Sequence, residues 1–237
     1  CTLIRRAWSL TALRIAAPLT LVATTLIATA STLNWVAFAH SCVIIILVFL
    51  PELGNSLVDG LSYGNERRLL LRCPSALYLG PLPLTWVMTV SGILLGPILL
   101  VNSQWLYGSL SIILGIPIAG AGIRSMHQLS KRWIIFVPNG FVLHDLLSTR
   151  EPFLIRRADI SSLGAIKTGA SLESEGLLDI SQNALGAVLQ ASIDGEVEVV
   201  PQSRRIAEVK AVKQVLFSPT RPGAALKEAA NRNLPRL

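Results

Sequence analysis

The stretch IAAPLTLVATTLIATASTLNWVAFAHSCVIIILVFLP, Ile15–Pro51, contains no Asp, Glu, Lys or Arg. A membrane-spanning helix needs about 20 mostly apolar residues, so this stretch can hold two helices joined by a turn. A second charge-free stretch runs from Cys73 to Ile123, and the polar residues 102–104 divide it in two. The two stretches therefore predict two transmembrane hairpins, with helices at about 10–31, 35–51, 82–101 and 105–123.

The overall composition agrees with this division. The chain of 237 residues is 51% hydrophobic and 15% charged, with a mean hydropathy of +0.56, whereas soluble domains carry about 25% charged residues. Charged residues return at ordinary density from Arg124 onward. We therefore predict a transmembrane domain over 1–127 and a polar domain over 128–217. The net charge of +7 comes without basic stripes interleaved with aromatics, so nucleic acid is not an expected partner.

The basic residues beside the predicted helices set the orientation. Cytoplasmic loops carry an excess of Lys and Arg, and four helices place every basic cluster of this half on one side. The residues expected at that membrane surface are Arg67, Arg68, Arg124, Lys131 and Arg132. The sequence thus predicts a multi-pass plasma-membrane protein, in contact with the lipid bilayer, whose N- and C-termini are both cytoplasmic.

Small residues mark the second predicted hairpin. Gly92 and Gly96 form a GxxxG pair, and Gly115 and Gly120 lie in the following helix. Such residues let helices approach closely in lipid, either within this chain or against a partner subunit, and both interpretations stay open. His40 is the one ionisable side chain deep in a predicted span. We expect it to make a hydrogen bond to a neighbouring helix or subunit, because no second intramembrane His accompanies it for haem binding.

The polar half shows the short alternating runs and turn signals of β structure. Asn139-Gly140 and Asp194-Gly195 are typical hairpin turns. An amphipathic helix is expected after Ser203, because apolar residues recur there at three- and four-residue steps, and the tail 218–237 is expected to be extended or disordered. The seven predicted strands are 133–137, 141–144, 152–156, 160–167, 177–180, 185–193 and 196–200.

The segment KRWIIFVPNGFVLHD, Lys131–Asp145, resembles the first hairpin of bacterial pleckstrin-homology-like (PH-like) domains. Seven strands followed by one helix are also the order of a PH-like barrel. The resemblance implies an α+β membrane protein in which four helices precede a cytosolic seven-stranded PH-like β-barrel with a C-terminal helix. The chain, with sixteen Arg and five Lys, is also similar to actinobacterial membrane proteins, some of which are accessory subunits of respiratory supercomplexes.

No catalytic or metal-binding motif is evident, so neither an enzyme nor a cofactor is expected. The neighbours His144 and Asp145 form the one pair that could orient a base. The leading hypothesis is a non-catalytic accessory or assembly subunit that docks onto other membrane protein subunits through its helices and its PH-like domain. Two alternatives stay open. One is a membrane enzyme or transporter for lipid or cell-wall precursors, with His40, Asn34 or Asn102 in a polar cavity; the other is a lipid-sensing module that uses Arg156 and Arg157.

Overall fold

The computed structural model describes residues 4–27, 32–166, 176–202 and 209–236. The chain divides into two compact units. The helical unit holds residues 1–57 and 76–130, and the β unit holds residues 58–75 and 131–237. The expected α+β class is confirmed, but the β unit includes a segment from between the two helical hairpins.

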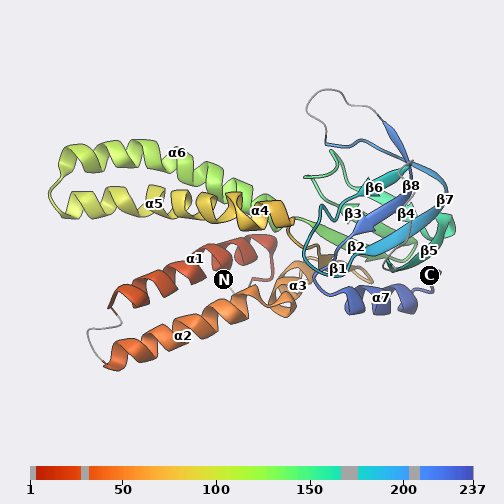
Figure 1. Cartoon of the computed structure of the whole chain (residues 1–237), viewed down its shortest axis with the longest axis horizontal. Helices are drawn as coiled ribbons and strands as arrows, with labels where there is room; N and C mark the ends of the chain where they lie inside the picture. Colours follow the sequence, from red (N-terminus) through yellow and green to blue (C-terminus); the bar gives the residue numbers. More distant parts are fainter. Residues whose placement is uncertain (1–3, 28–31, 167–175, 203–208, 237) are drawn as a thin grey trace. The chain divides into compact units, whose positions relative to one another are not determined.

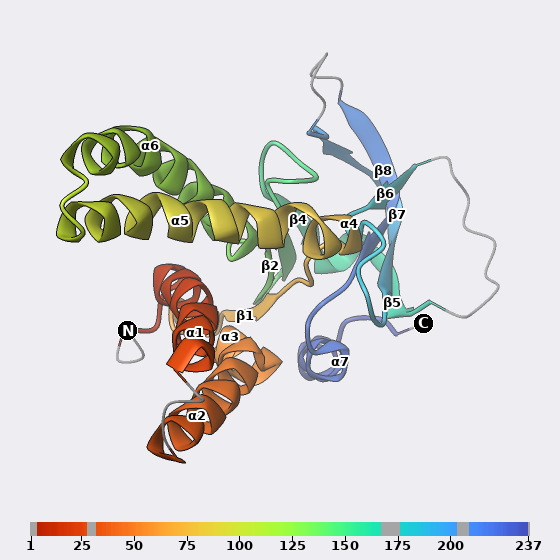
Figure 2. The same ribbon diagram turned by 60° about the vertical axis from the view of Figure 1, so that its left-hand side comes forward.

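The helical unit consists of two antiparallel hairpins. Figures 1 and 2 both show α1 lying between α2 and the α5–α6 hairpin. The helices are α1 (Ala7–Ile27), α2 (Thr32–Phe49), α3 (Pro51–Asp59), α4 (Ser75–Leu79), α5 (Pro81–Val101) and α6 (Trp105–Leu129); α3 crosses the boundary between the units.

Membrane-spanning helices are expected from the sequence, and the described residues contain three that are long and apolar enough. These are α1 over Ala7–Thr25, α5 and α6. A fourth span is present if α2 and α3 count as one, because they meet at a 55° bend. Pro51 begins α3, and proline is favoured in the first turn of a new helix, where its missing N–H costs nothing.

The β unit contains two four-stranded sheets instead of the expected closed seven-stranded barrel. The first has the order β1-β2-β3-β4 and the second the order β5-β7-β8-β6. The strands are β1 (Arg67–Leu70), β2 (Trp133–Val137), β3 (Gly140–His144), β4 (Phe153–Arg156), β5 (Ile160–Ala165), β6 (Leu177–Asp179), β7 (Leu189–Val199) and β8 (Lys210–Phe217). A short 3₁₀ turn, η2 (Arg157–Asp159), joins β4 to β5, which do not pair.

Three further predictions for this half are wrong. The amphipathic helix expected after Ser203 is β8 over its described part, since 203–208 lie outside the described residues. Asp194-Gly195 is no hairpin turn, because β7 continues through it with a register shift and pairs with β8 on both sides of it. The tail expected to be extended or disordered contains helix α7 (Pro222–Asn231).

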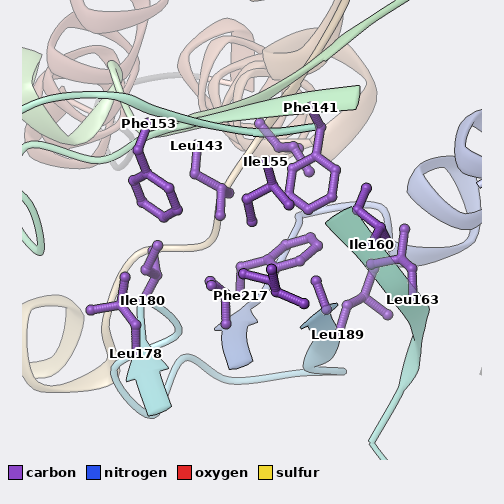
Figure 3. Packing of buried hydrophobic residues seen from close by; sticks show 14 of the residues in the cluster. Phe141, Leu143, Phe153, Ile155, Ile160, Leu163, Leu178, Ile180, Leu189 and Phe217 are labelled. Carbon is purple, nitrogen blue, oxygen red and sulfur yellow. The ribbon is translucent and has the colours of Figure 1, made fainter. Parts of the chain in front are cut away.

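One hydrophobic core fills the β unit. Strands of an antiparallel sheet send alternate side chains to opposite faces, and in the first sheet Phe141, Leu143 and Ile155 point inward and are fully buried. Figure 3 shows Phe141, Leu143, Phe153 and Ile155 facing a second group that includes Phe217 and Leu189. The residues of this second group come from the other sheet, so the two sheets enclose the core between them.

Candidate functional site

The glycines of the second hairpin are used within the chain. A Cβ atom on Gly92 would lie 2.6 Å from the carbonyl oxygen of Gly115, and one on Gly96 would overlap Ile112. The backbones of α5 and α6 therefore touch, as the packing interpretation expects. Gly120 is different, because a Cβ atom there would meet nothing within 4 Å among the described residues.

His40 lies on the exposed surface of α2. Its Nδ1 is 2.8 Å from the carbonyl oxygen of Val36, one turn earlier in the same helix. The opposite side of α2 packs against α1, where the hydroxyls of Ser41 and Thr24 are hydrogen-bonded at 2.8 Å. The imidazole therefore points away from the helical unit, and its expected partner on a neighbouring helix is not found among the described residues of this chain.

The structure places the three polar side chains of the transporter hypothesis on two different helical hairpins. Asn102 lies in the turn after α5, where its Nδ2 donates to the carbonyl of Ile98 at 2.8 Å, whereas His40 is exposed near the middle of α2. Asn34 lies in the first turns of α2.

A cluster of polar and aromatic contacts near the end of α6 was not predicted. The ring of His127 stacks on Trp8 with 3.7 Å between centroids, and its Nδ1 is 3.0 Å from the hydroxyl of Thr11. The Trp86 indole N–H also donates to the carbonyl of Ile15 at 3.0 Å. These contacts join α1 to α5 and α6. No local sequence pattern predicts these contacts, because the residues of each pair lie 71 to 119 positions apart.

Arg132 and Asp145 form a buried ion pair in the β unit. The side chain of Arg132 is 1% exposed and that of Asp145 is 0% exposed, and two hydrogen bonds of 2.8 and 2.7 Å join them. Arg132 also donates to the backbone carbonyls of Arg72 and Ile180. This burial is incompatible with the membrane-surface role expected for Arg132.

The other predicted surface residues are more accessible. Arg67 pairs with Asp59 and keeps 60% of its side chain exposed. Arg68 is bonded to Glu66 at 3.3 Å and lies over the Trp133 ring, 5.8 Å from its centroid. Arg124 is exposed and Lys131 is half-buried. Both Arg67 and Arg68 belong to β1, so the segment that carries them is part of a sheet and not a plain loop.

His144 and Asp145 do not act on a common group. Successive residues of a strand point to opposite faces, and here Asp145 reaches Arg132 while the His144 Nδ1 bonds the carbonyl of Lys131 at 2.8 Å. The His144 ring stacks on Trp133 with 5.0 Å between centroids. The two side chains therefore bond different groups, Arg132 and the Lys131 carbonyl.

A row of apolar side chains lies on the outer face of the first sheet, opposite the core. Ile135, Val142 and Leu154 are cross-strand neighbours in register on β2, β3 and β4. The first two are only partly exposed, and Leu154 is 40% exposed. We call these three residues the outer row. Arg68 pairs with Ile135 at one end, and the exposed Arg156 follows Leu154 by two residues.

A polar cleft of about 610 Å³ lies between the segment before β1, the β2–β3 turn and α7. Its charged groups are paired: Arg67 with Asp59, and Arg232 with Glu228 at 2.9 Å. Arg232 also bonds the carbonyl of Asn65. Among the described residues, no group of three His, Cys, Asp or Glu side chains is placed to hold a metal ion. The hydrogen bond from Arg232, at the end of α7, to Asn65 connects this helix to the segment before β1.

Comparisons of the chain with protein family models, with curated proteins and with solved structures find no match.

Proposed function

We propose that this chain is a non-catalytic accessory or assembly subunit of a larger complex in the plasma membrane. Its helices anchor it in the bilayer, and its β unit docks onto another subunit on the cytoplasmic side. The observation that carries the proposal is the outer row, Ile135, Val142 and Leu154, on the face of the first sheet that turns away from the core.

An antiparallel sheet that faces water on one side normally alternates apolar and polar residues. The strands β2 and β3 do not, since the residues between their buried positions are again apolar, Ile135 in β2 and Val142 in β3. Clustered apolar side chains on a surface mark contact sites for other proteins or membranes. A row of cross-strand neighbours on one face of a sheet fits a protein surface better than a small substrate.

The proposed orientation is that both termini are cytoplasmic. It is supported by the basic residues near the helix ends and by the pairing of β1 with β2. Because α5 and α6 lie between these two strands in the sequence, hydrogen-bonded strands require that the intervening chain cross the membrane an even number of times. A hairpin of two spans meets this condition.

A second candidate is recognition of anionic lipid headgroups by a PH-like module. Arg156 favours it, because this exposed side chain lies on the same face as Leu154 and beside the outer row. Arg157 is also exposed but belongs to η2. For the first candidate, an accessory subunit, the respiratory supercomplex suggested by the resemblance in sequence is the first assembly in which to look for this chain.

The test compares native complexes of three full-length, tagged proteins extracted from host membranes with a mild detergent. The wild type should migrate with other membrane subunits. In Val142→Lys a charge enters the docking face, and recovery of those subunits should fall about tenfold or more, as for a loss of at least about 1.4 kcal/mol. Ser161→Lys, at an exposed position of β5, is the matched control and should bind as the wild type does.

A wild-type protein that runs alone as a monomer would contradict the proposal. Retention of the subunits by Val142→Lys would remove the outer row from the docking surface. The lipid candidate predicts a different result: phosphatidylglycerol should be enriched over phosphatidylcholine around the purified protein in nanodiscs, and Arg156→Glu should abolish that enrichment.

A further inference from the structure

An exposed apolar stripe runs along α2, and a single polar side chain interrupts it. Val36, His40, Val43 and Leu47 follow one another at steps of four, three and four residues and are all exposed. This spacing places them along one line of a helix. His40 is eight residues after Thr32 and nine before Phe49, or about 12 and 14 Å from the two ends. An imidazole at that depth cannot reach the headgroups.

The hydrogen bond inside α2 determines which nitrogen of the His40 imidazole can accept a hydrogen bond from outside the helix. The carbonyl of Val36 can only accept, so the Nδ1 of His40, 2.8 Å away, must carry the proton. In a neutral imidazole the other nitrogen, Nε2, is then an acceptor with a free lone pair. The side chain is exposed, and Nε2 has no hydrogen-bond partner among the described residues.

An acceptor inside the membrane restricts which molecule can satisfy it. Acyl chains carry no hydrogen-bond donor, and polar groups in hydrocarbon need one. A second copy of this chain, related by a two-fold axis along the membrane normal, would bring His40 of one copy against His40 of the other. That arrangement opposes two acceptors and satisfies neither.

We infer that the stripe on α2 docks a transmembrane helix of a different protein, and that this helix supplies a hydrogen-bond donor to His40 Nε2. Donors available in such a helix include the hydroxyls of Ser, Thr or Tyr, the amides of Asn or Gln and the indole of Trp. Apolar side chains beside the donor would pack on Val36, Val43 and Leu47. The inference rests on the proposed function and adds to it the place and the chemistry of the intramembrane contact.

The experiment uses the full chain in its host membranes with a photo-crosslinking residue, benzoylphenylalanine, in place of Val43. The matched control carries the same residue in place of Ile116, which is 65% exposed on α6. Each protein is irradiated with His40 intact, with His40→Leu and with His40→Gln. Gln retains an acceptor oxygen, whereas Leu retains the volume without the acceptor. Elution of every variant at the wild-type volume in detergent shows that it is folded.

The expected result is one adduct with a different membrane protein from position 43 and none from position 116. Its yield should fall about three- to tenfold in His40→Leu and persist in His40→Gln. An adduct that forms equally well in His40→Leu overturns the inference while the accessory role stands. An adduct of two copies, or lipid adducts alone, also overturns it. The proposed function has its own readout in the native complexes, so the two can fail separately.

Discussion

Removing the Asp145 carboxylate leaves the Arg132 guanidinium buried without its counter-charge. Arg132 is 1% exposed, and two of its hydrogen bonds end on Asp145. Asp145 also accepts from the backbone N–H of Leu147 at 3.1 Å and from the hydroxyl of Ser148 at 2.8 Å. Breaking a buried ion pair of this kind costs about 3–5 kcal/mol, so Asp145→Ala should lower the unfolding free energy of the β unit by that amount.

Brief thermolysin digestion of the full chain in detergent, across a urea series, measures this loss, because the unfolded β unit is cleavable while helices in the micelle are protected. With a slope of about 2 kcal/mol per molar urea, the midpoint should fall by about 1.5–2.5 M. The matched control is Glu196→Ala, which removes the partner of Lys213 in an ion pair with both side chains more than half exposed. Exposed pairs contribute about 0–1 kcal/mol. Equal midpoint shifts in the two variants would refute the assigned role of the buried pair.

Two further predictions concern the helical hairpin and its orientation. Gly115→Val should push α6 away from Gly92 and destabilise the hairpin by about 1–3 kcal/mol in thermal unfolding, whereas Gly120→Val, in open space, should change it by less than about 0.5 kcal/mol; equal effects would contradict the packing. In a cysteine-free background, Asn102→Cys should react with a membrane-impermeant maleimide in intact cells, and Asn139→Cys only after permeabilisation. Labelling of both from outside would exclude the proposed orientation.

The apolar helices could be predicted because their signal is local. Charge-free stretches of sufficient length leave few alternatives in a bilayer, and the glycines of α5 and α6 could be expected to lie at a helix contact. The choice between contact within the chain and contact with a partner could not be made from sequence. It depends on which faces of α5 and α6 meet. Among the described residues, Gly120 is the one glycine of these two helices where an added Cβ atom would have no neighbour within 4 Å.

The β unit was harder to predict, because its strands depend on pairing between segments far apart in the sequence. β1 has four residues, two of them Arg, and becomes a strand by pairing with β2 across an entire helical hairpin. In β8, Val212 and Leu216 have helical spacing, but pairing with β7 determines the structure. The sequence does contain patterns that favour two other features of the β unit, helix α7 and the Arg132–Asp145 pair. Pro222 followed by an Ala-rich run favours a helix, and extending the β2–β3 register by one pair places Arg132 opposite Asp145.

The position of β1 has consequences for how the chain can be synthesised and handled. β1 leaves the ribosome before α5 and α6, but its partner β2 follows them, so the first sheet cannot close until the hairpin has been inserted. A soluble fragment that begins at Lys131 would lack β1 and expose the edge of β2, a template for aggregation. A fragment for crystallisation or for raising antibodies should therefore carry 67–70 grafted ahead of β2.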